Sequence, residues 1–363
     1  MPDGARHRAR RVAGLIRANL GPGYDVTIGR AVVDLDPVLG LVVRVDNLDV
    51  SDSNKAVVAH LPSTRFAIDP YALLALRVEV KQVELSDPEL SFARGDGGAI
   101  YLGTGATPQP PRKAAAAAAP LSPAEIERAD GGFPDLLAAL YVLDRGIEPQ
   151  IEGAIKAGFE RFAIINGTIS VSNAGQDQPR RFPGTDLNVA LDKTTSGLAV
   201  TLATSGYGGR WTATVDRQFD ARSGDHQMSA VFSQLTIADL VPSLGDDNSL
   251  LTADIPLYGR ANIRFGKDGS VEDASARLDF GAGVVRFGED RDSVLLDEAT
   301  VQAHWDIANR ALILDPSTFY FGDTRGVVTG KIAPSGDAAD RRYTFDLESP
   351  GRCWRPAIPD CRP

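Results

Sequence analysis

Cysteine and histidine are scarce in this chain. Of its 363 residues, two are cysteines and four are histidines. Both cysteines, Cys353 and Cys361, lie in the last eleven residues. The body of the chain therefore has no spacing typical of a disulfide framework or a zinc site. We expect no metal and no cofactor.

Long apolar runs are also missing. No stretch reaches the roughly 18 apolar residues that a membrane-spanning helix requires, and the charged N-terminus lacks the apolar centre of a signal peptide. The net charge of −10 leaves no basic stripe along the chain, which argues against a nucleic-acid partner. The single basic cluster is N-terminal and includes Arg10, Arg11 and Arg17.

Motifs that carry chemistry are absent too. The histidines are scattered, and His60 and His304 lie in strand patterns, which favours packing roles over catalysis. No nucleophile elbow or phosphate-binding loop occurs. The glycine clusters at 95–98 and 206–209 are typical of hairpin turns, and the acidic run at 246–248 is typical of a solvated turn. We expect a protein that is not an enzyme and has no catalytic residue.

Alternation of apolar and polar residues is what the sequence has in abundance. Within residues 24–94 it places one row of side chains on a buried face and the other toward water. Only residues 70–75 break the pattern: Asp69 is a possible N-cap and Pro70 fits the first helical position. The same alternation returns after Arg161 and recurs, with turn residues between the runs, as far as Leu347.

These patterns predict a mainly β fold, a long antiparallel and curved β-meander that forms a groove, with a few short helices. In 123–162, glycine and proline cut the expected helix into short pieces, and Asn166-Gly167 is a turn signal between two strands. A short helical insert is expected at 236–244. Six divisions are expected along the chain. They are a basic amphipathic helix (1–20), a meander with its short helix (21–102), a Pro/Ala linker (103–123), a helical segment (124–160), a β-repeat region (161–348) and an irregular tail (349–363).

The segments at 21–52 and 66–98 resemble the AsmA-like superfamily of bacterial envelope proteins, in particular its YhdP and TamB types. Residues 255–283 and 301–332 resemble the central β-repeats of that family. The resemblance implies an inner-membrane helix, a periplasmic β-trough, and phospholipid carried toward the outer membrane. The family's membrane helix and C-terminal repeats have no counterpart here, so we expect a truncated fragment of a periplasmic, inner-membrane-associated parent protein.

Three functions compete at this stage. The first is a lipid-handling module of envelope biogenesis, whose apolar rows line a groove for phospholipid acyl chains. The second is a structural scaffold or interaction module in which the same rows pack shut, and the third is a β-sandwich hydrolase, for which no carboxylate pair is evident. The N-terminal basic helix either caps the sheet or contacts an anionic membrane surface through Arg10, Arg11 and Arg17. The expected groove-lining residues are Leu41, Val43, Val45, Val78, Val80, Leu187, Val189, Ile263 and Trp305.

Overall fold

The computed structural model describes residues 23–37, 39–94, 100–103, 134–172, 179–206, 208–220, 222–236, 239, 251–287, 292–309, 311–335 and 342–349. The predicted helix at 5–20 lies outside these residues. So do nearly all of the linker at 103–123 and of the tail at 349–363, most of the insert at 236–244, and the turns at 95–98 and 246–248.

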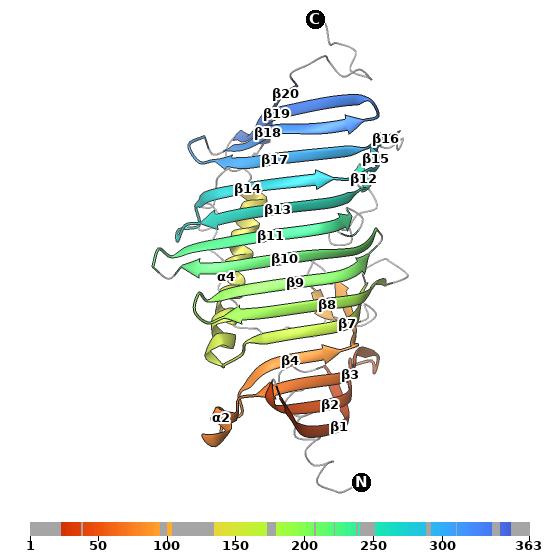
Figure 1. The fold of residues 1–363 in the computed structure, drawn as a ribbon, viewed down its shortest axis with the longest axis vertical. Coiled ribbons are helices and arrows are strands. Elements are labelled where there is room, and N and C mark those ends of the chain that lie inside the picture. Colours follow the sequence, from red (N-terminus) through yellow and green to blue (C-terminus); the bar gives the residue numbers. More distant parts are fainter. Residues whose placement is uncertain are drawn as a thin grey trace, which may run out of the picture. The chain divides into compact units, whose positions relative to one another are not determined.

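The predicted mainly β meander is confirmed. In the described residues, 17 strands form one largely antiparallel sheet and three form a small second sheet (Figure 1). The chain divides into two compact units. Unit 1 comprises Met1–Ala119 and Glu148–Thr214, and unit 2 comprises Pro120–Ile147 and Val215–Pro363.

Unit 1 begins with a meander in which successive strands pair antiparallel. Its strands are β1 (Asp25–Asp36), β2 (Gly40–Ser51), β3 (Val57–Ile68), β4 (Val80–Ser86), β5 (Glu89–Arg94), β6 (Ile100–Leu102), β7 (Arg161–Ser172), β8 (Arg180–Asp192) and β9 (Gly197–Gly206). Strands β4 and β5 pair antiparallel with successive parts of β3. On their other side, both pair in parallel with β7. The parallel step follows from the long connection that the chain makes between β6 and β7.

Unit 2 continues the meander with antiparallel neighbours. Its main strands are β10 (Gly209–Asp220), which begins in unit 1, β11 (Asp225–Thr236), β13 (Pro256–Phe265), β14 (Val271–Phe280), β17 (Glu298–Asp306), β18 (Ala311–Phe321), β19 (Thr324–Ser335) and β20 (Arg342–Glu348). The small sheet contains β12 (Leu251–Asp254), β15 (Gly283–Phe287) and β16 (Asp292–Leu296). The turn predicted at 206–209 connects β9 to β10.

Helix α2 (Pro70–Leu74) confirms the predicted insert. The carboxylate of Asp69 caps it by accepting hydrogen bonds from the backbone N–H groups of Tyr71 and Ala72. The strand that follows begins at Val80, later than the predicted run of Leu76, Val78 and Val80, because Leu76 has a positive φ of 60° that ends the helix in a turn.

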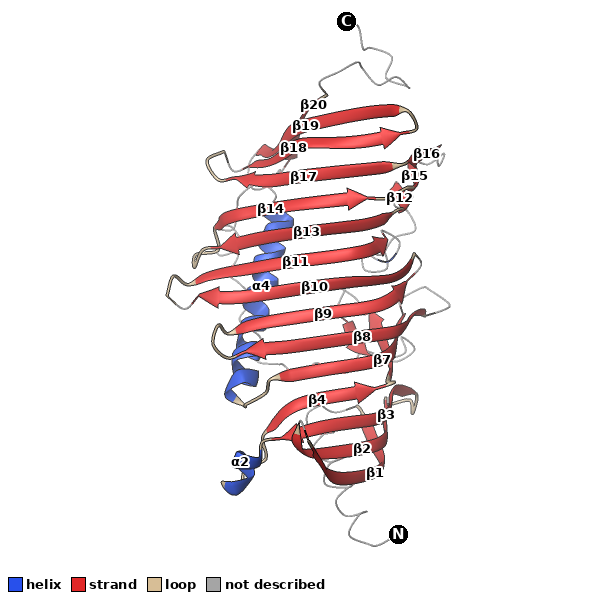
Figure 2. Ribbon diagram, viewed as in Figure 1, coloured by secondary structure: helices blue, strands red, loops and turns tan. Residues whose placement is uncertain are grey.

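Helix α4 (Pro134–Lys156) is one helix of 23 residues with Pro149 inside it (Figure 2). The prediction of short pieces was therefore wrong. An internal proline costs a helix about 3 kcal/mol, and packing along the helix offsets this cost, since Tyr141, Asp144 and Ile151 are all buried.

The Asn166-Gly167 pair lies inside β7, so the predicted turn there was also wrong. Asn166 has a φ of 54°, and the register of β7 with β8 shifts around Gly167. The pair forms a β-bulge, in which a residue with positive φ kinks a strand without ending it. Gly167 fits because a Cβ atom there would lie 2.7 Å from Ile164 Cγ2 and 3.1 Å from Pro88 Cγ.

We expect Gly167→Ala to lower the free energy of unfolding by about 1–3 kcal/mol, the usual cost of overpacking. Gly153→Ala is the matched control, because a Cβ at Gly153 meets nothing within 4 Å. In a helix that substitution stabilises by up to about 1 kcal/mol. Urea denaturation of the two variants measures both effects, and equal shifts would contradict the bulge assignment.

Candidate functional site

An apolar face runs across the strands of unit 1. Cross-strand partners share a face of the sheet, so the register identifies its members. Three rows follow: Leu41, Ile68 and Val80; Val43, Phe66, Val83, Phe162, Val189 and Val200; and Val45, Thr64, Leu85, Ile164, Leu187 and Leu202. We call this set the apolar face of unit 1. It contains six of the predicted groove residues.

Burial changes along the row that begins at Val45. At the β1–β6 end the side chains form a closed core, in which Val45 is 0% exposed. There the sheet curls until its ends meet, and the hydroxyl of Tyr24 donates a 2.7 Å hydrogen bond to the carbonyl oxygen of Leu102. At β8 and β9, by contrast, Leu187, Val189 and Val200 are only half-buried. The row from Val43 to Val200, by contrast, is half-buried along its whole length.

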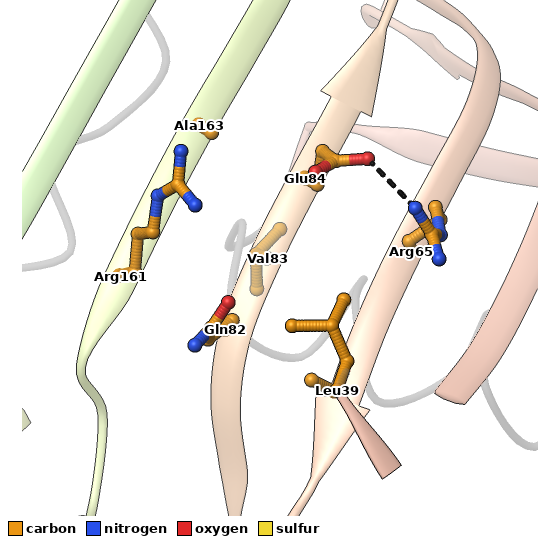
Figure 3. Close-up of a pocket in the computed structure, with 8 residues that line it drawn as sticks. Leu39, Arg65, Gln82, Val83, Glu84, Arg161 and Ala163 are labelled. Atoms are coloured by element: carbon orange, nitrogen blue, oxygen red, sulfur yellow. Dashed lines mark hydrogen bonds and ion pairs between the residues drawn. The ribbon is translucent and has the colours of Figure 1, made fainter. Parts of the chain in front are cut away.

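The opposite face of unit 1 is polar. Arg65 forms ion pairs with Asp36 and Glu84, and Arg161 Nε donates a 2.6 Å hydrogen bond to Asn188 Oδ1. A hollow between these strands has a volume of about 10 Å³ (Figure 3), roughly that of one water position. A larger hollow of about 410 Å³ is lined by charged residues that include Asp34, Asp36, Arg44 and Arg65. Neither suits an acyl chain.

Unit 2 repeats the division into an apolar and a polar face. The rows on its apolar face are Met228, Ile263 and Ala274; Ala230, Ala261, Ala276, Ala303 and Leu314; and Trp305, Leu312 and Ile332. Ile263 and Trp305, both predicted groove residues, are 9% and 7% exposed. The middle row is half-buried throughout. We call this set the apolar face of unit 2.

The remaining predicted residues lie elsewhere. Val78 precedes β4 and is 72% exposed, so it is not on the apolar face. Arg10, Arg11 and Arg17 lie outside the described residues. His60 and His304 make cross-strand pairs, as expected: His60 Nδ1 lies 2.5 Å from Asp49 Oδ1, and His304 Nδ1 lies 3.0 Å from Asp315 Oδ2.

The first half of α4 packs on the apolar face of unit 2. Tyr141 contacts Phe265, with ring centroids 5.4 Å apart, in a cluster that includes Ile263 and Met228. A Cβ atom at Gly269 would lie 2.8 Å from the Tyr141 ring, so the turn between β13 and β14 has no room for a side chain there. This aromatic contact fixes the helix against β13.

One helical turn after Tyr141, Asp144 enters a buried cluster of ionisable groups. Nε of Arg217 on β10 donates a 2.6 Å hydrogen bond to its Oδ1, and Nδ1 of His226 on β11 lies 2.7 Å from its Oδ2. His226 Nδ1 also lies 3.1 Å from Arg217 Nη2. All three side chains are at most 2% exposed.

Sequence reasoning missed this cluster, although one signal was present. Arg217 follows Trp211, Ala213 and Val215 at the spacing of side chains that share one face of a strand. A charge in an apolar row needs a buried partner. That partner, Asp144, is 73 residues away in the sequence, so the pairing itself could not be derived from a local pattern.

Burial by itself raises the pKa of the Asp144 carboxyl, but the hydrogen bonds from His226 and Arg217 outweigh it and hold the pKa below the ordinary value of 3.8. A carboxyl with a lowered folded-state pKa stabilises the fold above its unfolded pKa. That stability is lost as the pH falls through the folded pKa.

We therefore expect acid to remove part of the stability of the wild-type protein through Asp144. In Asp144→Asn that part is already absent, so the unfolding free energy of the variant should fall less steeply below about pH 4. Denaturant titrations at a series of pH values measure the two slopes. Identical slopes would mean that Asp144 does not contribute to acid sensitivity.

The described residues contain no group of three or more His, Cys, Asp or Glu side chains placed to hold a metal ion. Nor does any helix among them combine the length and hydropathy needed to cross a membrane. Comparisons with protein-family models, curated proteins and solved structures find no match to this chain.

Proposed function

We propose that this chain is a non-catalytic, AsmA-like protein of the cell envelope. It holds or conducts phospholipid acyl chains along the apolar faces of its sheet, between inner and outer membranes. The observation that carries the proposal is the continuity of apolar rows from β2 to β9, of which the row from Val43 to Val200 is half-buried along its whole length. The sequence resemblance at 21–52 and 66–98 supports a periplasmic site of action beside the inner membrane.

The energetics favour an acyl chain as the occupant. Each methylene removed from water contributes about 0.8 kcal/mol, and the row from Val43 to Val200 offers only apolar side chains for that contact. Contiguous apolar surface in a soluble protein marks a binding site for apolar partners. On the polar face of unit 1, the hollows found among the described residues mix charged side chains such as Asp36 and Arg65 with apolar ones such as Val42.

Val189→Asp tests the proposal. A carboxylate placed in the middle row puts a charge where acyl methylenes would lie, and we expect loss of binding of a fluorescent fatty acyl probe by about tenfold or more. Asn188→Asp is the matched control. It adds the same charge one residue earlier in β8, on the polar face, where Arg161 already donates to the side chain. Its binding should equal that of wild type, and equal losses in both variants would contradict the proposed face.

The second candidate function, a structural scaffold, is favoured by the closed core at the β1–β6 end. There Val45, Leu48 and Val50 are all at most 3% exposed and leave no room for a ligand. If the chain is a scaffold, the wild-type protein binds no lipid. Val189→Asp then changes the stability of the protein and leaves lipid binding absent. The two functions therefore differ in the wild-type measurement itself.

The basic N-terminal segment stays a prediction. Contact of Arg10, Arg11 and Arg17 with an anionic membrane would place the lipid-binding sheet next to its source of lipid. Flotation of the full chain with vesicles that contain anionic lipid, compared with neutral vesicles, measures that contact.

A further inference from the structure

The Asp144 cluster has a feature that helix anchoring does not require. Apolar side chains of similar volume would hold α4 as well as a buried ion pair, or better. One turn earlier on α4, Tyr141 already holds the helix by apolar packing on Phe265. Arg217 and His226 nevertheless place a guanidinium group and an imidazole on an otherwise apolar face, beside Met228 and Phe265.

The two side chains surround an anion. They come from neighbouring strands, and each approaches a different oxygen of the same carboxylate, at 2.6 Å and 2.7 Å. Arginine and protonated imidazole nitrogens bind phosphate oxygens with this two-point geometry. The carboxylate that fills the receptor belongs to α4, a different element of the same unit.

We propose that Arg217 and His226 form a phosphate-binding site on the apolar face of unit 2, and that Asp144 occupies this site as a competing internal anion. The ligand is an anionic phospholipid, whose acyl chains follow the apolar rows while its phosphate replaces the Asp144 carboxylate. The inference rests on the proposed function and adds to it a headgroup preference and a release step. When phosphate takes the site, the first half of α4 loses its ionic anchor.

The surroundings suit this exchange. The site lies next to the row of Met228, Ile263 and Ala274, so an acyl chain attached to the phosphate would meet apolar side chains at once. Phe219 of β10 packs against the His226 ring at a tilt of 44°, with ring centroids 4.8 Å apart. Both side chains of the receptor therefore come from the sheet, from β10 and β11.

The experiment compares three probes on the full chain. Dihexanoylphosphatidic acid below its micelle concentration carries the phosphate and the acyl chains, dihexanoylglycerol carries the chains alone, and inorganic phosphate carries the anion alone. Asp144→Asn removes the internal competitor and keeps the receptor. We expect it to bind the phosphatidic acid about tenfold more tightly than wild type, the gain from one charge-assisted hydrogen bond. Its affinity for dihexanoylglycerol should not change. Arg217→Gln should bind both lipids equally.

A second measurement uses wild-type protein alone, so it does not depend on variants that fold poorly. We expect the phosphatidic acid to raise amide hydrogen exchange in residues 134–147 of α4, and dihexanoylglycerol to leave that exchange unchanged. Unchanged or slower exchange with the phosphatidic acid would overturn the proposal.

The probes separate the possible failures. Equal binding of both lipids by wild type and Asp144→Asn would overturn the headgroup site and leave the acyl-binding function standing. Binding of neither lipid would overturn the proposed function and this inference together. Tighter binding of inorganic phosphate by Asp144→Asn without any gain for the lipid would assign the receptor to free phosphate, which overturns the lipid assignment.

Discussion

Asp144→Ala should lower the free energy of unfolding by about 3–5 kcal/mol, the cost of removing one partner from a buried ion pair. The carboxylate is 0% exposed and accepts a 2.6 Å hydrogen bond from Arg217. Without it, the guanidinium group, itself 2% exposed, remains buried beside His226 with its main anionic partner gone. Denaturant unfolding followed by circular dichroism measures the loss.

Glu152→Ala is the control on the same helix. Glu152 forms an i,i+4 ion pair with Lys156 at 2.7 Å, and both side chains are exposed. Such a pair contributes only about 0.3–0.5 kcal/mol, so the control should be close to wild type. A second check replaces Asp144, Arg217 and His226 together by leucine or methionine. That triple variant should recover most of the stability. A cost for Asp144→Ala as small as that of the control would contradict the anchoring role of the cluster.

Phe265→Ala should cost about 3–5 kcal/mol, the range for a fully buried phenylalanine. Phe265 is 0% exposed and lies opposite His226 in the pairing of β13 with β11. It packs against Tyr141 of α4, so the cavity left by the substitution would loosen the helix as well as the sheet. Thermal unfolding measures the loss, and amide hydrogen exchange locates it to residues 134–147.

Tyr258→Ala is the matched control for this prediction. Tyr258 is on the same strand, is 38% exposed, and lies on the opposite face from Leu257. Its truncation should cost less than half as much as Phe265→Ala, because little surface is removed from the core. If Phe265→Ala left exchange in α4 unchanged, the aromatic contact would not hold the helix.

Much of the fold could be predicted from the sequence because it depends on local patterns. Alternation identifies a strand and its buried face together, so Val43, Val45, Leu187 and Val189 could be placed on one face before any pairing was known. The cap of α2 was equally local, since Asp69 and Pro70 are adjacent in the sequence. In such cases a few neighbouring residues determine the structure.

The failures have a common physical origin in long-range packing. Gly146 and Pro149 weaken a helix locally, yet α4 continues through them because its buried residues contact the sheet. Asn166-Gly167 favours a turn locally, yet pairing with β8 on both sides keeps β7 continuous as a bulge. The pairing of Asp144 with Arg217 depends on how α4 lies on β10, which no short window of sequence contains.

Native mass spectrometry of the full chain, expressed and purified without detergent, tests the central claim most directly. We expect phospholipid bound to the wild-type protein, identified by extraction and fragmentation, and its loss in Val189→Asp but not in Asn188→Asp. A lipid-free wild-type protein with a single cooperative melting transition would contradict the account. It would mean that the half-buried rows at β8 and β9 serve only the packing of the sheet.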